Sequence, residues 1–179
     1  GDRVLKDYPD SFAGLGQGYA FGAVSIGLCI FAVLALLTAL FLHGTRWGHS
    51  LFAMGTNAVA ARWSGIPVDR YRFALFCATG LMSGLAAAML TSRLGSTRPS
   101  IAQGWELEII SIVVLGGVAI SGGKGTIGGV VLAAVLLGFV SFGLSLLNVP
   151  GVVMWIVFGA LLITVIAIPA LAHRWMQWR

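Results

Sequence analysis

"GAVSIGLCIFAVLALLTALFL", Gly22–Leu42, is a run of 21 residues without a charge. A transmembrane helix needs about 20 consecutive apolar residues, because the hydrocarbon layer is about 30 Å thick and a helix rises about 1.5 Å per residue. The stretch therefore predicts a membrane span. The whole chain agrees, since 58% of its 179 residues are hydrophobic and 9% are charged, with a mean hydropathy of +0.95. A soluble domain carries about 25% charged residues.

Three further stretches are apolar and long enough to cross a bilayer: Phe73–Leu90, Val130–Leu147 and Val152–Leu171. A fifth stretch, Ile109–Ile120, would be only about 18 Å long as a straight helix. Extended by Trp105–Glu108 or by the glycines after it, this stretch predicts a short or broken span, which is tolerated only inside a bundle. The expected fold class is all-α, a polytopic transmembrane helix bundle of about five membrane segments forming one domain, residues 1–179.

The charges of the connecting segments predict the orientation, because Lys and Arg are retained on the cytoplasmic side. The segments before Gly22 and from Thr91 to Glu108 hold four basic and five acidic residues, whereas the other connecting segments and the C-terminal tail hold seven basic residues and one acidic residue. Five crossings that begin outside and end inside place every basic cluster, and the C-terminus, in the cytoplasm. The pI of 9.9 then reflects topology in a lipid bilayer, and no nucleic acid partner is implied.

The segment "ISGGKGTIGG", Ile120–Gly129, contains a literal G-x-G-x-x-G. A dinucleotide site needs a strand before this motif and an acidic residue about 20 positions later, but no Asp or Glu follows Glu108. The phosphate-binding pattern G-x-x-x-x-G-K-[ST] also fails, because Val118 replaces its first glycine and Gly125 its hydroxyl residue. We therefore predict no nucleotide or other cofactor. The glycines are expected to supply positive φ angles and close backbone approach in a tight cytoplasmic turn, with Lys124 facing water and lipid phosphates.

The sequence contains no recognisable catalytic or metal-binding constellation. Cys29 and Cys77 fall inside different spans, where they are expected to pack as small apolar residues. The three histidines, His43, His49 and His173, fall at the predicted cytoplasmic ends of spans. No His or acidic residue falls deep in the long spans, which argues against an intramembrane enzyme and weakens the case for a proton-driven carrier.

The stretch "GTNAVAARWSGIPVDRYR", Gly55–Arg72, belongs to the longest cytoplasmic loop, residues 43–72. Thr56 or Asn57 is expected to cap a short helix, Ala58–Trp63, which ends at Gly65 in a left-handed conformation and cannot continue through Pro67. Its alanines and one valine would form an apolar centre with a charged rim, either as a docking surface or as a helix lying on the bilayer. The rim consists of Arg62, Asp69, Arg70 and Arg72.

Two groups of residues lie on the predicted outer side. Arg93 and Arg98, in a segment of Ser, Gly, Thr and Pro, are expected either to pair with an acidic partner or to remain solvated. Trp105, Glu106 and Glu108 begin the short span. These three residues predict either a transport pathway, since acidic groups at membrane depth usually face a cavity, or an interfacial anchor, since Trp is enriched at the headgroups.

Several of these stretches resemble one protein family. The loop "GTNAVAARWSGIPVDRYR" resembles that of the permease subunits of ATP-binding-cassette importers for monosaccharides, the ribose, rhamnose and autoinducer-2 group. The stretch "SRLGSTRPSIAQGWELEIISIVVLGGVAISGGKGTIGG" is similar to the following segment of the same family. The opening "GDRVLKDYPDSF" and the stretch Arg93–Glu108 look most similar to rhamnose-system permeases. The similarity extends to about Pro169, and because family members are much longer, the chain is expected to be a C-terminal half.

The resemblance implies a bacterial inner-membrane importer for rhamnose or a similar monosaccharide. Its parts would be two permeases, as identical copies or paralogues, two cytoplasmic ATPase subunits and a periplasmic sugar-binding protein. The permease would not be an enzyme, since its ATPase partners would hydrolyse ATP, and Arg93 and Arg98 would contact the binding protein. The implied coupling helix, seated in a groove of the ATPase, comprises Asn57, Ala60, Ala61, Arg62, Gly65, Ile66 and Val68.

A second function class remains open beside the importer subunit, namely a self-contained secondary carrier or channel for a small polar solute. Stimulation of a copurifying ATPase would favour the importer, whereas uptake driven by an ion gradient without a partner would favour the carrier. We also expect this chain to be inactive alone, because half a bundle cannot enclose a pathway.

Overall fold

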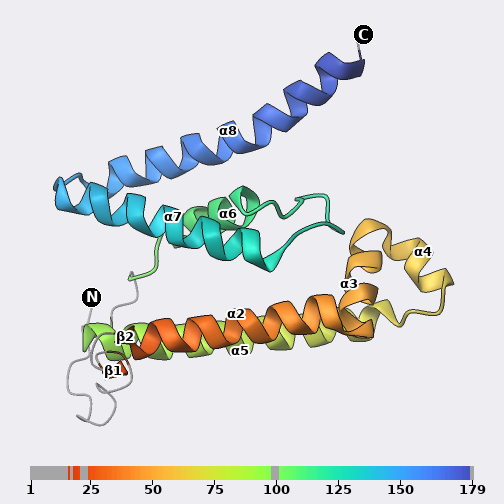
Figure 1. Ribbon diagram of the computed structural model, residues 1–179, viewed down its shortest axis with the longest axis horizontal. Coiled ribbons are helices and arrows are strands. Elements are labelled where there is room, and N and C mark those ends of the chain that lie inside the picture. Colours follow the sequence, from red (N-terminus) through yellow and green to blue (C-terminus); the bar gives the residue numbers. More distant parts are fainter. Residues whose placement is uncertain (1–15, 17, 21–23, 98–100, 178–179) are drawn as a thin grey trace. The chain divides into compact units, whose positions relative to one another are not determined.

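A computed structural model describes Gly16 and residues 18–20, 24–97 and 101–177 (Figure 1). The chain forms two compact units, Gly1–Ala102 and Gln103–Arg179. Each unit is built from helices, as the sequence predicts, and the described residues add only two strands of two residues each.

The first unit begins with a small β-ladder before its first long helix. The strands β1 (Tyr19–Ala20) and β2 (Val24–Ser25) pair antiparallel, with Tyr19 opposite Ser25. The helix α2 (Ile26–Gly44) follows directly. The predicted start of the first span at Gly22 is therefore wrong, because Val24 and Ser25 are held in extended backbone by the ladder.

A sharp corner joins α2 to α3 (Arg46–Thr56). At this corner the Thr45 hydroxyl donates a hydrogen bond to the Phe41 carbonyl at 2.6 Å and accepts one from the Gly48 amide at 3.2 Å. Gly48 is buried, and a Cβ there would collide with the Leu42 carbonyl oxygen. The missing side chain of Gly48 thus permits the close approach of the two helices.

The stretch predicted as a loop, residues 43–72, is largely helical. The helix α3 fills its first part, α4 (Ala58–Trp63) its centre, and α5 (Val68–Leu94) begins at Val68 rather than at Phe73. The sequence prediction did not include α3. The charged residues after Pro67 did not prevent helix formation, because charged side chains are compatible with a helix that extends beyond the apolar layer.

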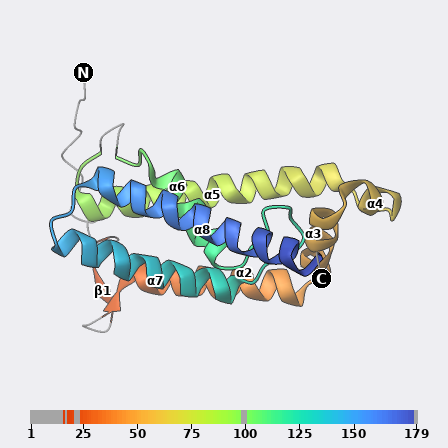
Figure 2. The ribbon, with the colours of Figure 1, turned by 90° about the horizontal axis from the view of Figure 1, so that it is seen from above.

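The helix α5 runs without a break for 27 residues, which corresponds to about 40 Å at the rise of an α-helix (Figure 2). It ends at Gly95, which adopts a left-handed conformation with φ +61° and donates its amide to the Thr91 carbonyl at 2.9 Å. The helix is longer than the hydrocarbon layer is thick. Its two ends therefore extend beyond the apolar region of any bilayer that it crosses at a small tilt.

The second unit contains α6 (Trp105–Leu115), α7 (Ile127–Leu146) and α8 (Gly151–Gln177). The helix α6 packs against both α7 and α8. The core of the second unit is formed by residues with at most 3% of their surface exposed: Ser111, Ala133, Leu137 and Phe158. The Ser111 hydroxyl donates to the Leu107 carbonyl at 2.7 Å and lies 3.4 Å from the Phe158 carbonyl oxygen, so it links α6 to α8.

The short apolar stretch Ile109–Ile120 is not one helix. The helix α6 ends at Leu115, where Gly117 has φ +84° and the Val118 amide donates to the Val113 carbonyl at 3.2 Å. This pattern is a Schellman motif, which a glycine in the left-handed conformation favours. The structure thus confirms a short helical segment, extended at its start by Trp105–Glu108 and followed by a non-helical stretch before α7.

Among the residues that the structure describes, three helices are long and apolar enough to cross a membrane: α2, α5 and α7. In α8, the apolar part whose side chains the structure describes, Gly151–Ala167, is shorter. The most apolar stretches of α2 and α5 contain no buried residue. Apolar surface on this scale requires contact with lipid or with further protein, since soluble proteins rarely expose it.

Candidate functional site

In chain order, the short helix α4 falls between the membrane-length helices α2 and α5, after α3, where the sequence places it. Figure 1 shows α3 and α4 together at one end of the first unit. Asn57 is its N-cap, because the Asn57 Oδ1 atom accepts hydrogen bonds from the amides of Val59 and Ala60, both at 3.0 Å. Thr56, the other candidate cap, belongs to α3 and donates its hydroxyl to the Ala53 carbonyl at 2.7 Å. The cap satisfies two amides that would otherwise lack helical partners.

The end of α4 is as sharp as its start. Gly65 has φ +85°, its amide donates to the Arg62 carbonyl at 3.1 Å, and the Ile66 amide donates to the Ala61 carbonyl at 3.1 Å. These two bonds form a Schellman motif with glycine in the left-handed position. Pro67 then precedes the first residue of α5. The predicted bounds of the helix, and the role of Gly65 in ending it, are confirmed.

Two side-chain contacts hold this helical region against the start of α5. The Arg62 Nη2 atom lies 2.7 Å from Oδ1 and 2.9 Å from Oδ2 of Asp69. On α3, the Trp47 ring packs against the Tyr71 ring, with the ring centroids 4.7 Å apart. The ion pair is exposed, with 61% of the Arg62 and 79% of the Asp69 side chain accessible, so water and salt screen it.

The residues assigned to coupling differ in burial. Ala61 and Val68 are 5% and 2% exposed, so they pack inside the unit and offer little surface to a partner. Ile66 is half-buried. The exposed members of the set are Asn57, Ala60, Arg62 and Gly65.

Sequence reasoning missed Trp63 and left Val59 outside the coupling set. Trp63 is 88% exposed and Val59 is 68% exposed. Because they are four positions apart in one helix, they share a face. We call this pair the α4 apolar ridge. The quoted stretch does contain a tryptophan and a valine at helical spacing, and this spacing is the signal that could have identified the ridge.

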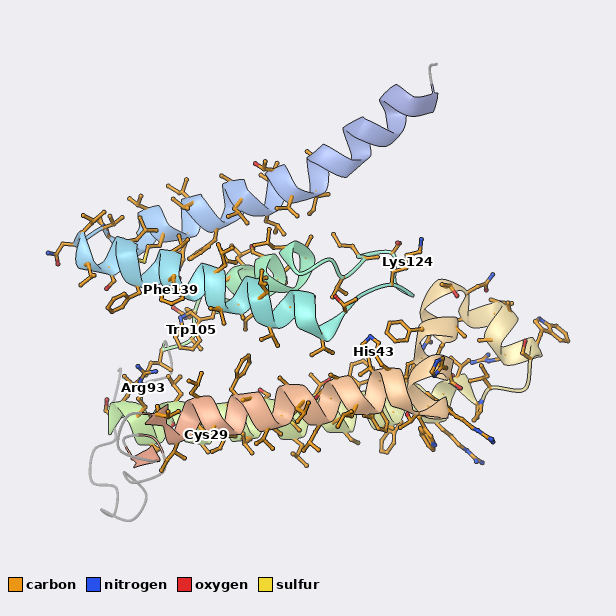
Figure 3. The ribbon with its side chains drawn as sticks, viewed as in Figure 1. Cys29, His43, Arg93, Trp105, Lys124 and Phe139 are labelled. Carbon is orange, nitrogen blue, oxygen red and sulfur yellow. The ribbon has the colours of Figure 1, made fainter. Side chains whose placement is uncertain are left out.

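Arg93 and the coupling residues lie at opposite ends of α5. Val68 begins the helix, and Arg93 is exposed in its last turn. Figure 3 shows Arg93 at one end of the first unit and His43, near the start of α3, at the other. The assignment of these two ends to opposite sides of a membrane stays a prediction. Arg98 lies outside the residues that the structure describes.

At the start of α6, the Glu108 side chain makes a hydrogen bond to α7. The Ser141 hydroxyl of α7 donates to the Glu108 Oε1 atom at 3.2 Å, and both residues are half-buried. Trp105 and Glu106 are exposed. Ser141 is a second residue that sequence reasoning missed, because its distance of 33 positions from Glu108 leaves no local pattern.

The glycine-rich segment is a turn between α6 and α7, with a helix and not a strand before it. Gly122 and Gly123 have φ +87° and +75°. The Ala119 amide donates to the Lys124 carbonyl at 2.9 Å, which closes the turn, and Lys124 is exposed. Figure 3 shows Lys124 and Trp105 toward opposite ends of the second unit. The predicted positive φ angles and tight turn are confirmed.

The sequence profile of one protein family matches residues 1–166, and its description is "branched-chain amino acid transport system / permease component". The autoinducer 2 import system permease protein LsrD of Salmonella typhimurium is 34% identical over 181 residues, which cover 99% of this chain and 54% of that protein. The LsrD protein of Yersinia enterocolitica is 35% identical over 185 residues, covering 100% of this chain and 56% of that protein.

The ribose import permease protein RbsC of Escherichia coli K12 is 39% identical over 140 residues, which cover 78% of this chain and 43% of that protein. The chain thus spans about half the length of the curated relatives that it matches. No solved structure matches it significantly.

Proposed function

Because this chain belongs to the family of branched-chain amino acid transport system permease components, we propose that it is part of the membrane-spanning subunit of an ATP-driven importer for a monosaccharide. Rhamnose or a similar sugar is the proposed cargo. The importer sits in the bacterial inner membrane, with the C-terminus of this chain in the cytoplasm. The names of the ribose and autoinducer 2 permeases, which describe import systems, support this class of cargo.

The observation that carries this proposal is the geometry of α4. A six-residue helix is too short to persist alone, yet α4 is fixed by a cap at Asn57, a Schellman motif at Gly65 and burial of Ala61. It precedes the membrane-length helix α5, is linked to the membrane-length helix α2 through α3, and exposes an apolar ridge. A helix that is rigid, exposed and attached to spans is suited to receive force from a soluble partner.

The proposed partners follow from this arrangement. Cytoplasmic ATPase subunits contact α4 through Asn57, Ala60 and Gly65 and through the α4 apolar ridge. Ala61, Ile66 and Val68 support the helix from inside, and Arg62 serves coupling through its ion pair with Asp69. A second permease, as a copy or a paralogue, completes the membrane part. A periplasmic sugar-binding protein docks on the opposite side through Arg93 and Arg98. The permease supplies the pathway, and its partner hydrolyses ATP.

At the start of α6, Glu108 is the residue that we propose to face the pathway. Its carboxylate is half-buried and hydrogen-bonded across to α7, as expected for an acidic group at membrane depth that lies inside a bundle. The exposed Trp105 and Glu106 are proposed as an anchor at the membrane interface, where Trp is enriched.

Reconstitution tests the function directly. The full-length permease is placed in proteoliposomes with the ATPase and binding protein encoded beside its gene, and sugar uptake and ATP hydrolysis are measured together. We expect uptake that requires ATP and both partners, and faster hydrolysis when the permease is present. Uptake that an ion gradient drives without either partner would instead establish a secondary carrier.

A further inference from the structure

We propose that Arg62 acts as a positioning residue, which braces the corner between α4 and α5 through Asp69 so that motion of α4 is passed into α5. This inference rests on the proposed function. It assigns Arg62 a role inside the chain in place of the direct contact with an ATPase that the family resemblance implies.

The contacts around the corner support this role. Residues 64–67 alone connect α4 to α5, and three backbone hydrogen bonds close the turn: Gly65 to Arg62 at 3.1 Å, Ile66 to Ala61 at 3.1 Å and Val68 to Ile66 at 2.8 Å. Ala61 before the turn and Val68 after it are both buried. The exposed ion pair spans the same turn, because Arg62 precedes the turn and Asp69 follows it, seven positions later.

The chemistry of the two partners suits a brace. One guanidinium nitrogen of Arg62 reaches both carboxylate oxygens of Asp69, which restricts the side chains more than a single hydrogen bond would. Asp69 also lies in the first turn of α5, where the helix dipole favours a negative charge. An Arg62 side chain engaged in this way is not available as an unpaired charge for a partner protein.

The helix beyond the corner is suited to carry the motion. The helix α5 continues for 27 residues from Val68, and an uninterrupted helix transmits displacement without a hinge. On the other flank of the corner, the packing of Trp47 on Tyr71 ties α3 to the same first turns of α5. The two helices that flank α4 in the chain, α3 and α5, are thus held to each other.

A charge swap in the full-length permease, reconstituted with its ATPase and binding protein, tests the brace. The variants are Arg62→Asp, Asp69→Arg and the double variant that carries both changes. We expect each single variant to lower sugar uptake per ATP hydrolysed by roughly two- to fivefold, the range that a weak exposed ion pair can supply, while the ATPase still copurifies. The double variant should recover uptake per ATP toward the wild-type value, incompletely because arginine is disfavoured in the first turn of a helix.

Two controls keep the result interpretable. Lys124→Asp reverses an exposed charge in the turn between α6 and α7 of the second unit, and it should leave uptake per ATP unchanged. Asp69→Asn, a milder change, should raise the hydrogen exchange rates of the Gly65 and Ile66 amides even if the charge reversals express poorly.

Three results would overturn the inference: wild-type uptake per ATP in the single variants, failure of the double variant to recover, or loss of ATPase copurification in Arg62→Asp and in the double variant alike. The last result would mark Arg62 as a direct contact. If the wild-type permease neither binds the ATPase nor imports sugar with ATP, the proposed function itself fails, and the two failures are thereby distinguished.

Discussion

Gly116 and Gly129 lie so close together that neither has room for a side chain. A Cβ on Gly116 would lie 2.6 Å from the Val130 Cα atom, and a Cβ on Gly129 would collide with the Gly116 carbonyl oxygen. The end of α6 and the first turn of α7 therefore meet backbone to backbone. In the segment that resembles a nucleotide motif, Gly123 serves the turn between the two helices, and Gly129, just after the motif, serves this contact.

Gly129→Ala is expected to destabilise the second unit by about 1–3 kcal/mol, because the added methyl forces the backbones apart in a packed region. Gly128→Ala is the matched control, since it lies one position earlier in α7 and a Cβ there meets nothing within 4 Å. Unfolding of the purified protein in mixed detergent micelles measures the difference. Equal stability of the two variants would contradict the close approach of Gly116 and Gly129.

Gly65→Val is expected to lower sugar uptake per ATP hydrolysed. A Cβ at Gly65 meets no atom within 4 Å, so the effect would come from the left-handed backbone, where a residue with a side chain costs about 1–2 kcal/mol. Gly65→Asn should be milder, because asparagine tolerates this conformation better than β-branched residues. Equal uptake per ATP in Gly65→Val and wild type would show that the sharp end of α4 is not needed for coupling.

Glu108→Ala and Ser141→Ala are expected to be coupled in stability, because the side chains of Glu108 and Ser141 share one hydrogen bond between α6 and α7. A double-mutant cycle in detergent should give an interaction of about 0.6 kcal/mol, typical of hydrogen bonds between membrane helices. Ser145→Ala, at an exposed position of α7, should show no coupling to Glu108→Ala. Additive effects of the first pair would argue against the contact.

Arg93→Glu combined with Arg98→Glu is expected to reduce uptake when the binding protein is scarce and to have little effect when it is abundant. Each exposed pair contributes only about 0–1 kcal/mol, so the change should appear as a higher apparent KM for the binding protein and should shrink at high salt. Arg72→Glu, near the other end of α5, is the control. Unaltered uptake at low binding-protein concentration would remove docking from the roles of these arginines.

Local patterns in the sequence were enough to predict α4 and its two ends. Asn57, Gly65 and Pro67 act through backbone hydrogen bonds and dihedral angles within a few residues, so their effects do not depend on distant parts of the fold. The same holds for the uncharged stretch that became α2 and for the glycine turn before α7. The start of α2 was misplaced because the pairing of Val24 with Ala20 adds no hydrophobic signal.

Contacts between distant positions were not predictable from one sequence. The hydrogen bond of Ser141 with Glu108 and the packing of Trp47 on Tyr71 depend on how helices pack, and no local spacing encodes them. The helix α3 was missed because its Gly48 and Gly55 weaken helix propensity, while contact with its neighbours stabilises it. The burial of Ala61 and Val68 likewise follows only from the fold of the corner.

Cysteine labelling of Ala60 tests most directly whether α4 receives an ATPase from the cytoplasm. Ala60 is exposed, and Ala60→Cys is made in a full-length permease whose own cysteines are replaced by serine. A membrane-impermeant maleimide should label it in inside-out vesicles and not in intact cells, and the added ATPase should protect it. Labelling of intact cells from the periplasmic side, or labelling that the ATPase does not reduce, would contradict α4 as the point of coupling.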